Sequence, residues 1–175
     1  MAVLEVELAL PDAAATEILG DALARTFPGA ERSSAALYLE GDLGAGKTTC
    51  VRALLRSFGV SGLIRSPTYT LVEAYRLDGR SPPLTCVHVD LYRLAGAAQV
   101  EELGLRDFLT AGYLLLIEWP QKGAGALAPP DLTMSLEFVT DARHARLAAT
   151  TELGTKWLGD LRDDARLASY LSNLT

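Results

Sequence analysis

The sequence predicts an α/β fold with a mostly parallel sheet flanked by helices, to which antiparallel strands are added in the C-terminal part. Two observations support this fold class. Short apolar runs alternate with stretches of helical periodicity along most of the 175 residues. One apolar run, residues 35–40, leads directly into a glycine-rich loop, and a helical pattern begins immediately after that loop. The length fits one domain, which we expect to span residues 1–175.

The glycine-rich loop reads Gly41-Asp42-Leu43-Gly44-Ala45-Gly46-Lys47-Thr48-Thr49 and matches Gly-x-x-x-x-Gly-Lys-Thr, the P-loop of nucleoside triphosphatases. Its glycines allow backbone angles that other residues resist, so main-chain N–H groups can surround phosphate oxygens. The helix that begins near Lys47 directs its unpaired N–H groups at the same anion. We expect Lys47 to bind the β- and γ-phosphates and the Thr48 hydroxyl to bind Mg²⁺. The fold is therefore expected to be of the P-loop NTPase type.

The N-terminal elements follow this scheme in order. Residues 2–10 alternate apolar with acidic side chains and predict a strand. A helix is expected over 13–27, because an aspartate that can cap it precedes it and a Pro-Gly pair follows it. After the strand over 35–40, apolar residues recur at helical spacing from 47 to 58, and Gly59 is a natural end of that helix.

The central elements are two further strands with a helix between them. Residues 64–75 predict a loop that enters an edge strand, since Pro67 cannot donate to a sheet. Buried strands are expected over 85–90 and 113–118, because both runs are almost wholly apolar. A short helix is expected over 101–109. This central helix is expected to turn Leu103, Leu105 and Phe108 inward.

The C-terminal elements differ from the alternation of strands and helices in the rest of the chain. Residues 132–140 and 145–151 predict an antiparallel pair, which we expect at one edge of the sheet. A final helix is expected over about 155–171.

The composition describes a globular protein without a broad nucleic-acid surface. The formal net charge is −6, and the sixteen basic residues are scattered along the chain. Cys50 and Cys86 lack metal-ligand spacing, so both are interpreted as buried apolar groups and not as a disulfide. The sequence contains neither a signal-peptide pattern nor an apolar run long enough for a membrane span. A cytoplasmic protein without a membrane partner is therefore expected.

Two carboxylates follow the buried strands. Glu118 ends an apolar run of the Walker B form, whose acid holds Mg²⁺ directly or through water. Asp90 has the same placement and is interpreted as a second metal-shell carboxylate or as the group that orients the attacking water. A helix cap or a turn acid remains an alternative for Asp90. His88 is interpreted as a packed core residue, and Trp119 as a packing residue that also has the position to cover the site.

The run Ser66-Pro67-Thr68-Tyr69-Thr70 resembles a switch loop, because a rigid proline lies beside hydroxyl groups that can reach a γ-phosphate or a metal. An ordinary hydroxyl-rich loop is the alternative. The guanine motif Asn-Lys-x-Asp is absent, which favours adenine as the base. Arg143 is included among the predicted nucleotide ligands, although spacing singles out none of the four candidate arginines, Arg65, Arg76, Arg93 and Arg143.

Four motifs, taken in this order, resemble the bacterial TsaE (YjeE) family: Gly41–Thr49, Ser66–Glu73, Asp90–Leu94 and Glu118–Pro120. The order and spacing agree from Pro11 to about Arg146, whereas the C-terminal residues resemble the family only loosely. Four motifs in one order are far more specific than any one of them.

The resemblance implies a small ATPase of tRNA threonylcarbamoyladenosine biosynthesis that binds ATP and Mg²⁺ and is slow on its own. Such proteins join the TsaB–TsaD pair, which transfers a threonylcarbamoyl group to the adenosine next to the anticodon in tRNAs reading codons that begin with A. ATP hydrolysis resets that complex between turnovers. The chain would therefore meet tRNA only indirectly, through the complex.

The resemblance also implies roles for individual residues. Thr48 and Glu118 would be the Mg²⁺ ligands, while Lys47 and the rest of the loop from Gly41 to Thr49 bind phosphates. Asp90 would support hydrolysis, and Thr68 would be the switch-like residue. Two residues would lie beside the nucleotide, with Thr16 lining the adenine pocket and Trp119 next to the site.

Two other functions remain open on the sequence. A P-loop kinase for a small molecule would need an arginine-rich lid that excludes water, and no compact insertion of that kind is visible. A non-catalytic module, in which ATP only orders the 66–70 loop for a partner, is disfavoured by the carboxylates Asp90 and Glu118 but is not excluded.

Overall fold

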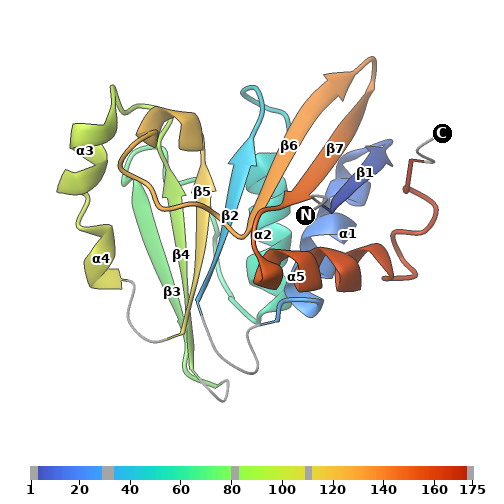
Figure 1. Ribbon diagram of the computed structural model, residues 1–175, viewed down its shortest axis with the longest axis horizontal. Helices are drawn as coiled ribbons and strands as arrows, with labels where there is room; N and C mark the ends of the chain where they lie inside the picture. Colours follow the sequence, from blue (N-terminus) through green and yellow to red (C-terminus); the bar gives the residue numbers. More distant parts are fainter. Residues whose placement is uncertain (1–3, 29–33, 80–82, 109–111, 173–175) are drawn as a thin grey trace.

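A computed structural model describes residues 4–28, 34–79, 83–108 and 112–172 (Figure 1). It contains a seven-stranded sheet with the strand order β1-β7-β6-β2-β5-β4-β3. The elements are β1 (Glu5–Leu10), α1 (Ala13–Arg25), β2 (Ala35–Glu40), α2 (Lys47–Ser57), β3 (Val72–Leu77), β4 (Leu84–Asp90), α3 (Ala97–Glu102), α4 (Leu105–Phe108), β5 (Tyr113–Glu118), the 3₁₀ turn η1 (Pro120–Gly123), β6 (Leu132–Val139), β7 (Ala142–Ala149) and α5 (Glu152–Arg162).

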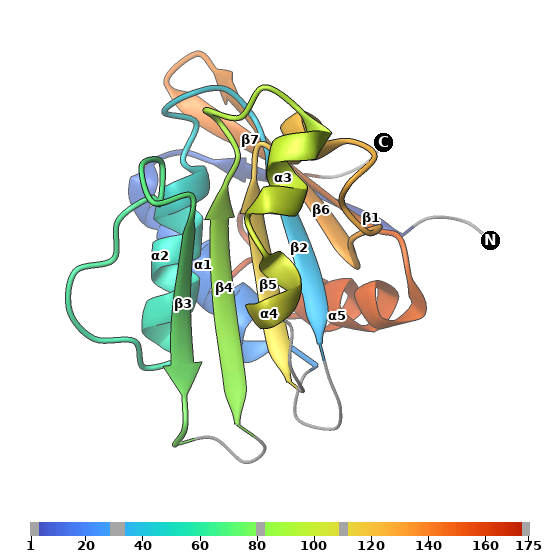
Figure 2. The ribbon, with the colours of Figure 1, turned by 90° about the vertical axis from the view of Figure 1, so that its left-hand side faces the viewer.

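The middle of the sheet is parallel, as the sequence predicts. Strand β2 lies between β5 and β6 and is parallel to both, and β4 adds in parallel to the far side of β5. Helices α1, α2 and α5 cover one face, while α3 and α4 cover the other (Figure 2). Because parallel strands point the same way, the loops that follow β2, β4 and β5 emerge at one edge of the sheet.

Antiparallel strands lie on both sides of this parallel middle. Strand β3 pairs with β4 at one edge, and the hairpin β6–β7 extends the sheet on the other side. The expectation that the hairpin forms the edge is wrong, because β1 pairs with β7 and is outermost. The reason is the alternation in β1, whose apolar side chains Val6, Leu8 and Leu10 all face one side of the sheet and are buried in the core there.

The larger core lies under α1, α2 and α5. Helices α1 and α2 approach closely at Gly20, where an added Cβ would lie 2.3 Å from the backbone oxygen of Cys50. Trp157 of α5 is fully buried, and its ring meets that of Phe27 edge to face at a centroid distance of 5.3 Å. Its indole N–H donates to the backbone oxygen of Leu23 over 3.0 Å. This contact fixes α5 against α1.

The helix predicted over 101–109 is wrong in its extent. The chain forms the two short helices α3 and α4, and they are separated at Gly104, which has a φ of +62°. Glycine at a left-handed position ends a helix, so the periodic pattern does not continue through it. Val100 is the buried residue here, whereas Phe108, predicted to face inward, is 36% exposed. Residue 109 lies outside the described residues.

The helix predicted over 155–171 is also wrong at both ends. It begins at Glu152, because the Thr151 side chain caps it by accepting from the backbone N–H of Gly154 over 3.0 Å. It ends at Arg162, because the Asp164 carboxylate accepts from the backbone N–H of Arg166 and so stabilises a turn instead of another helical turn.

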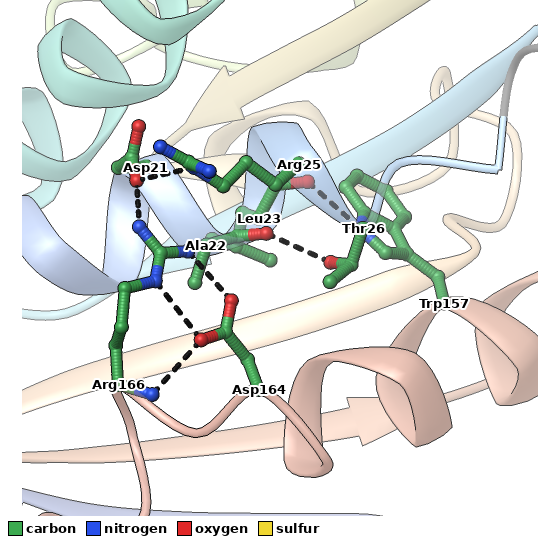
Figure 3. Close-up of polar contacts among 8 residues, drawn as sticks. All are labelled: Asp21, Ala22, Leu23, Arg25, Thr26, Trp157, Asp164 and Arg166. Carbon is green, nitrogen blue, oxygen red and sulfur yellow. Dashed lines mark hydrogen bonds and ion pairs between the residues drawn. The ribbon is translucent and has the colours of Figure 1, made fainter.

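The segment after α5 is nevertheless ordered against the rest of the domain (Figure 3). The Arg166 guanidinium donates to Asp164 of its own segment and to Asp21 of α1. Leu167 is fully buried, and Leu171 forms an isolated antiparallel bridge with Leu8 of β1. The C-terminal segment therefore joins α1 to the outer edge of the sheet.

The bounds of several elements agree with the sequence prediction. The predicted strand bounds of β2 and β5 match the observed ones, and α2 begins at Lys47. Cys50 and Cys86 are both buried and form no disulfide. Within the described residues, none of the helices has the length and apolar character needed to cross a membrane.

Candidate active site

Most of the predicted site residues meet at the edge of the sheet where β2, β4 and β5 end. Asp90 and Glu118 are register partners at the ends of β4 and β5, and the P-loop follows β2 directly. A cavity of about 400 Å³ opens between them. It is lined by Leu43, Gly44, Gly46, Lys47, Thr48, Thr49, Ser66, Thr68, Tyr69, Asp90, Tyr92, Arg93, Glu118 and Trp119.

The P-loop backbone requires glycine where it leaves β2. Gly41 has a φ of +130°, and an added Cβ would lie 2.2 Å from the backbone oxygen of Leu136 on β6. Gly46 is the N-cap of α2, with a φ of +111°. The helix thus begins immediately at the cavity, with its first N–H groups available to an anion.

Lys47 lies inside the cavity wall and is only 4% exposed. Its Nζ donates to the backbone oxygens of Gly41 and Asp42 over 2.7 and 2.8 Å, and it lies 4.3 Å from the ring centroid of Trp119. Burial lowers the pKa of Lys47, while the carboxylates of Glu118 and other nearby acids oppose that change. An ammonium has three hydrogens, so one remains for a ligand in the cavity.

Glu118 is buried, with 3% of its surface exposed, as is Asp90. The Thr48 hydroxyl lies 2.8 Å from Oε1 and 3.0 Å from Oε2 of this carboxylate. On its other side, Nε2 of the fully buried His88 lies 2.9 Å from Oε1. Thr48 and Glu118 therefore place oxygen atoms at one point next to the phosphate-binding loop.

Asp90 is held by the loop that the sequence marks as switch-like. The hydroxyls of Ser66 and Thr68 donate to its Oδ2 over 2.6 and 2.7 Å. The backbone N–H of Tyr92 donates to its Oδ1 over 2.9 Å. Leu71 ties the loop to β4, because its backbone oxygen accepts from the backbone N–H of Asp90 over 3.0 Å. The position of this loop is thus coupled to that of the acid.

Aromatic side chains form the mouth of the cavity. Trp119 has a φ of +60°, an uncommon value for a bulky residue, and this conformation turns the chain sharply after β5. Its ring packs on that of Tyr92 at a centroid distance of 5.0 Å. Across the mouth, the Arg93 guanidinium lies 4.3 Å from the ring centroid of Tyr69, which is 84% exposed.

Five predicted nucleotide ligands do not line the cavity: Thr16, Gly41, Asp42, Ala45 and Arg143. Two of them lie on the other side of the P-loop. An added Cβ on Gly46 would be 3.4 Å from Cγ2 of Thr16 and 3.5 Å from Nε of Arg143. The Arg143 side chain also donates to the backbone oxygen of Ala45 over 3.1 Å. These two residues therefore support the outer face of the loop.

The oxygen atoms around Thr48 fit a hard divalent cation such as Mg²⁺. Mg²⁺ prefers oxygen ligands and is usually held by one or two protein groups, substrate phosphates and water. Thr48 and Glu118 supply such oxygens beside the P-loop. Across the described ranges, no three or more histidines, cysteines or acids are grouped to hold a metal without other ligands. The donor set therefore matches a metal that is bound together with phosphate.

Sequence reasoning missed the contact between His88 and Glu118, because a histidine inside an apolar run is most often a packing residue. One pattern in the sequence does indicate that His88 faces the site. His88 precedes Asp90 by two residues on β4, and alternate residues of a strand face the same side of a sheet. It also missed Tyr92 as a lining residue, since its side chain carries no group that marks phosphate binding.

Sequence comparisons match the part of the chain that carries the four motifs. The family described as threonylcarbamoyl adenosine biosynthesis protein TsaE matches residues 10–148. The tRNA threonylcarbamoyladenosine biosynthesis protein TsaE of Haemophilus influenzae is 45% identical over 118 residues, which are 67% of this chain and 72% of that protein. The protein of the same name from Streptomyces coelicolor is 34% identical over 129 residues, which are 72% of this chain and 85% of that protein.

A solved structure shares the fold. The crystal structure of Bacillus subtilis YdiB superimposes with a TM-score of 0.70, covers 92% of this chain and 96% of that chain, and is 22% identical. At that identity the likeness concerns the arrangement of the elements. The matched family segment, residues 10–148, includes every residue that lines the 400 Å³ cavity.

Proposed function

Since the chain belongs to the TsaE family, we propose that it is a Mg²⁺-dependent ATPase that acts in tRNA threonylcarbamoyladenosine biosynthesis. The observation that carries the proposal is the meeting of four groups around one cavity. Lys47 and Thr48 of the P-loop and the carboxylates Asp90 and Glu118 line the same cavity. A phosphate-binding loop opposite two acids is the arrangement that phosphoryl transfer to water requires.

In this proposal the P-loop binds the phosphates of ATP. The first N–H groups of α2 and the Lys47 ammonium would stabilise the negative charge, and Lys47 would exchange its contacts with the backbone of the loop for phosphate oxygens. Thr48 and Glu118 would hold Mg²⁺. When bound, Mg²⁺ neutralises charge on the β- and γ-phosphate oxygens.

Asp90 would accept a hydrogen bond from the attacking water. Its Oδ2 already accepts from two hydroxyls, whereas its Oδ1 accepts one backbone N–H and retains a lone pair. That lone pair suits the role of orienting a water molecule and taking up its proton. Ser66 and Thr68 would keep the carboxylate in this orientation.

The biological setting of the proposal comes from the relatives, whose names assign them to tRNA threonylcarbamoyladenosine biosynthesis. We propose that the chain acts with TsaB and TsaD, and that its ATP hydrolysis resets that complex without performing the transfer. The net charge of −6 supports indirect contact with tRNA through the partners. ATP, Mg²⁺ and tRNA occur together in the cytoplasm, where we propose that the protein works.

One observation favours a second candidate function, a module in which nucleotide mainly controls the loop. The hydroxyls of Ser66 and Thr68 both donate to Asp90. A bound γ-phosphate would compete for these hydroxyls and move the loop toward a partner or away from it. A small-molecule kinase has less support, because Arg93 is the one arginine among the residues that line the cavity.

The test is ATP consumption with identification of the products, for the chain alone and then with TsaB, TsaD and tRNA. Slow release of ADP and phosphate, which accelerates with the partners, is the expected result. Lys47→Ala should abolish it, and Lys122→Ala, which changes an exposed lysine of η1, should not.

Each alternative gives a different result in the same assay. Transfer of phosphate to an added small molecule would support the kinase. Complex formation that depends on ATP, together with full function of a variant unable to hydrolyse it, would support the module. A rate that does not respond to TsaB and TsaD would contradict the proposed partners.

A further inference from the structure

We propose that His88 is a positioning residue for the metal ligand Glu118. In this inference, the imidazole Nε2–H holds the carboxylate toward Thr48, so that both side chains offer oxygen atoms to the same cation. The inference rests on the proposed function, because it assigns a role relative to the Mg²⁺ site. It adds a residue that neither the P-loop pattern nor the strand-end acids identify.

The first support is the burial of the contact. His88 is fully buried and Glu118 is 3% exposed, and the two side chains meet at 2.9 Å. A polar side chain in the middle of a buried strand is costly unless it is hydrogen-bonded. Its neighbours along β4, Val87 and Val89, are buried and apolar, and by the alternation of a strand they face the other side of the sheet. Because Nδ1 of the buried imidazole has no hydrogen-bond partner among the described residues, a histidine at this position costs stability that a leucine would not.

The second support is the direction of the hydrogen bond. A carboxylate accepts and does not donate, so the hydrogen must lie on Nε2. The other nitrogen, Nδ1, is buried without a hydrogen-bond partner among the described residues. A bare lone pair there is less costly than an unpaired N–H, and placing the hydrogen on Nδ1 would also turn a lone pair toward the carboxylate. Both nitrogens thus favour the same tautomer.

The third support is the way the contacts of Glu118 are divided. Oε1 accepts from both Thr48 and His88, whereas Oε2 contacts Thr48 alone. If the Thr48 hydroxyl turns its oxygen to a cation, the bond from His88 remains to fix the carboxylate. Because β4 and β5 are adjacent parallel strands in register, the backbone that carries the two side chains is rigid. The geometry suits a residue that orients a metal ligand.

The test compares variants with and without a donor at the position of Nε2. His88→Gln places a side-chain N–H near that position, whereas the side chain in His88→Asn is one methylene shorter and cannot reach Glu118. His88→Leu removes the donor but fills the space. The probe is a fluorescent ADP analogue, whose binding is measured while Mg²⁺ is titrated. His144→Gln, which changes the half-exposed histidine of β7, is the matched control.

We expect the Asn and Leu variants to need roughly 10- to 100-fold more Mg²⁺ for half-maximal enhancement of binding, the usual effect of losing a partner of a metal ligand. Binding of the analogue without Mg²⁺ should be unchanged in all variants. The Mg²⁺ midpoint of His88→Gln should stay close to that of the parent. A residue that only fills space would give the opposite order, with Leu tolerated better than Gln. Equal Mg²⁺ midpoints for Asn, Gln and the parent would overturn the inference.

A spectroscopic measurement tests the same contact without turnover or metal. The chain has two histidines, so His144→Gln leaves His88 as the one imidazole in a ¹⁵N spectrum. We expect a hydrogen on Nε2 and a change in its signal when Glu118 is replaced by Gln. A hydrogen on Nδ1 with a bare Nε2 would contradict the inference even if the Leu variant failed to fold.

These results also distinguish failure of the proposed metal site from failure of the role of His88. If the parent chain binds the analogue equally with and without Mg²⁺, the proposed metal site is wrong and the inference falls with it. If the parent responds to Mg²⁺ and all His88 variants respond alike, the role of His88 is wrong and the proposed function stands.

Discussion

Asp90 and Glu118 stand side by side at the ends of two adjacent parallel strands, yet each is held by a different set of donors. Asp90 accepts from the loop hydroxyls of Ser66 and Thr68. Glu118 accepts from Thr48 and contacts His88. Since one acid is tied to a loop and the other to the P-loop helix and a core histidine, the two are suited to different roles.

Replacing Asp90 by Asn should separate chemistry from binding. Loss of a positioned base typically lowers a rate by about 10²- to 10⁴-fold. Nucleotide affinity should change little, because Asp90 is held by Ser66 and the backbone of Tyr92, whereas the proposed phosphate ligands belong to the P-loop. Single-turnover hydrolysis and binding of a fluorescent nucleotide measure the two effects. Asp78→Asn, at the exposed turn after β3, is the control, and an equal loss of affinity and rate would contradict this division.

Trp119 should report nucleotide binding by its fluorescence. Its ring lies 4.3 Å from the Lys47 ammonium, which is proposed to exchange its contacts with the backbone oxygens of the loop for phosphate oxygens. The other tryptophan, Trp157, is buried in the core under α5. We expect ADP to change the emission of the parent and of Trp157→Phe but not of Trp119→Phe. A response retained in Trp119→Phe would show that the core tryptophan is the source.

Arg166 should stabilise the fold at neutral pH and lose this effect in acid. The Arg166 guanidinium lowers the pKa of Asp164 by hydrogen bonding. A lowered carboxyl pKa stabilises the folded state above the unfolded pKa, and this contribution disappears as the pH falls through the folded pKa. The stabilisation by Arg166 is therefore expected to be lost below about pH 4.

The measurement is the difference in melting temperature between the parent and Arg166→Gln. Exposed pairs contribute up to about 1 kcal/mol, which corresponds to roughly 2–4 °C in a chain of this size. The difference should be largest at neutral pH and should shrink below about pH 4. Arg162→Gln, which removes an exposed pair with Asp163, is the control and should show a smaller effect. A difference that does not depend on pH would mean that packing alone accounts for it.

Gly41→Ala should destabilise the domain through its backbone surroundings. The new Cβ would meet the backbone oxygen of Leu136 at 2.2 Å, and the φ of +130° is unfavourable for alanine. Gly125→Ala is a matched control, because Gly125 has a φ of +90° but open space around it. Unfavourable φ alone costs about 1–2 kcal/mol, so Gly41→Ala should lower the melting temperature by clearly more than the control. Similar melting temperatures for the two variants would contradict the close approach.

The predictions that succeeded from the sequence depend on neighbouring residues. The P-loop, the strands β2 and β5 and the positions of Asp90 and Glu118 at strand ends all follow from local patterns of glycine, apolar runs and a following acid. Such patterns are set by backbone angles and by the two-residue and 3.6-residue periods, which act over a few residues. Where one residue interrupted a period, as Gly104 and Asp164 do, the predicted helices ran too long.

The tertiary structure alone decided which distant residues meet. The sequence placed His88 in a buried strand, but only the register of β4 against β5 brings its Nε2 to Glu118. The outermost position of β1 and the contact of Thr16 and Arg143 with Gly46 are of the same kind. Strand order and side-chain contacts depend on packing between segments far apart in the chain. No local period encodes that packing, because it is the sum of many weak contacts across the whole core.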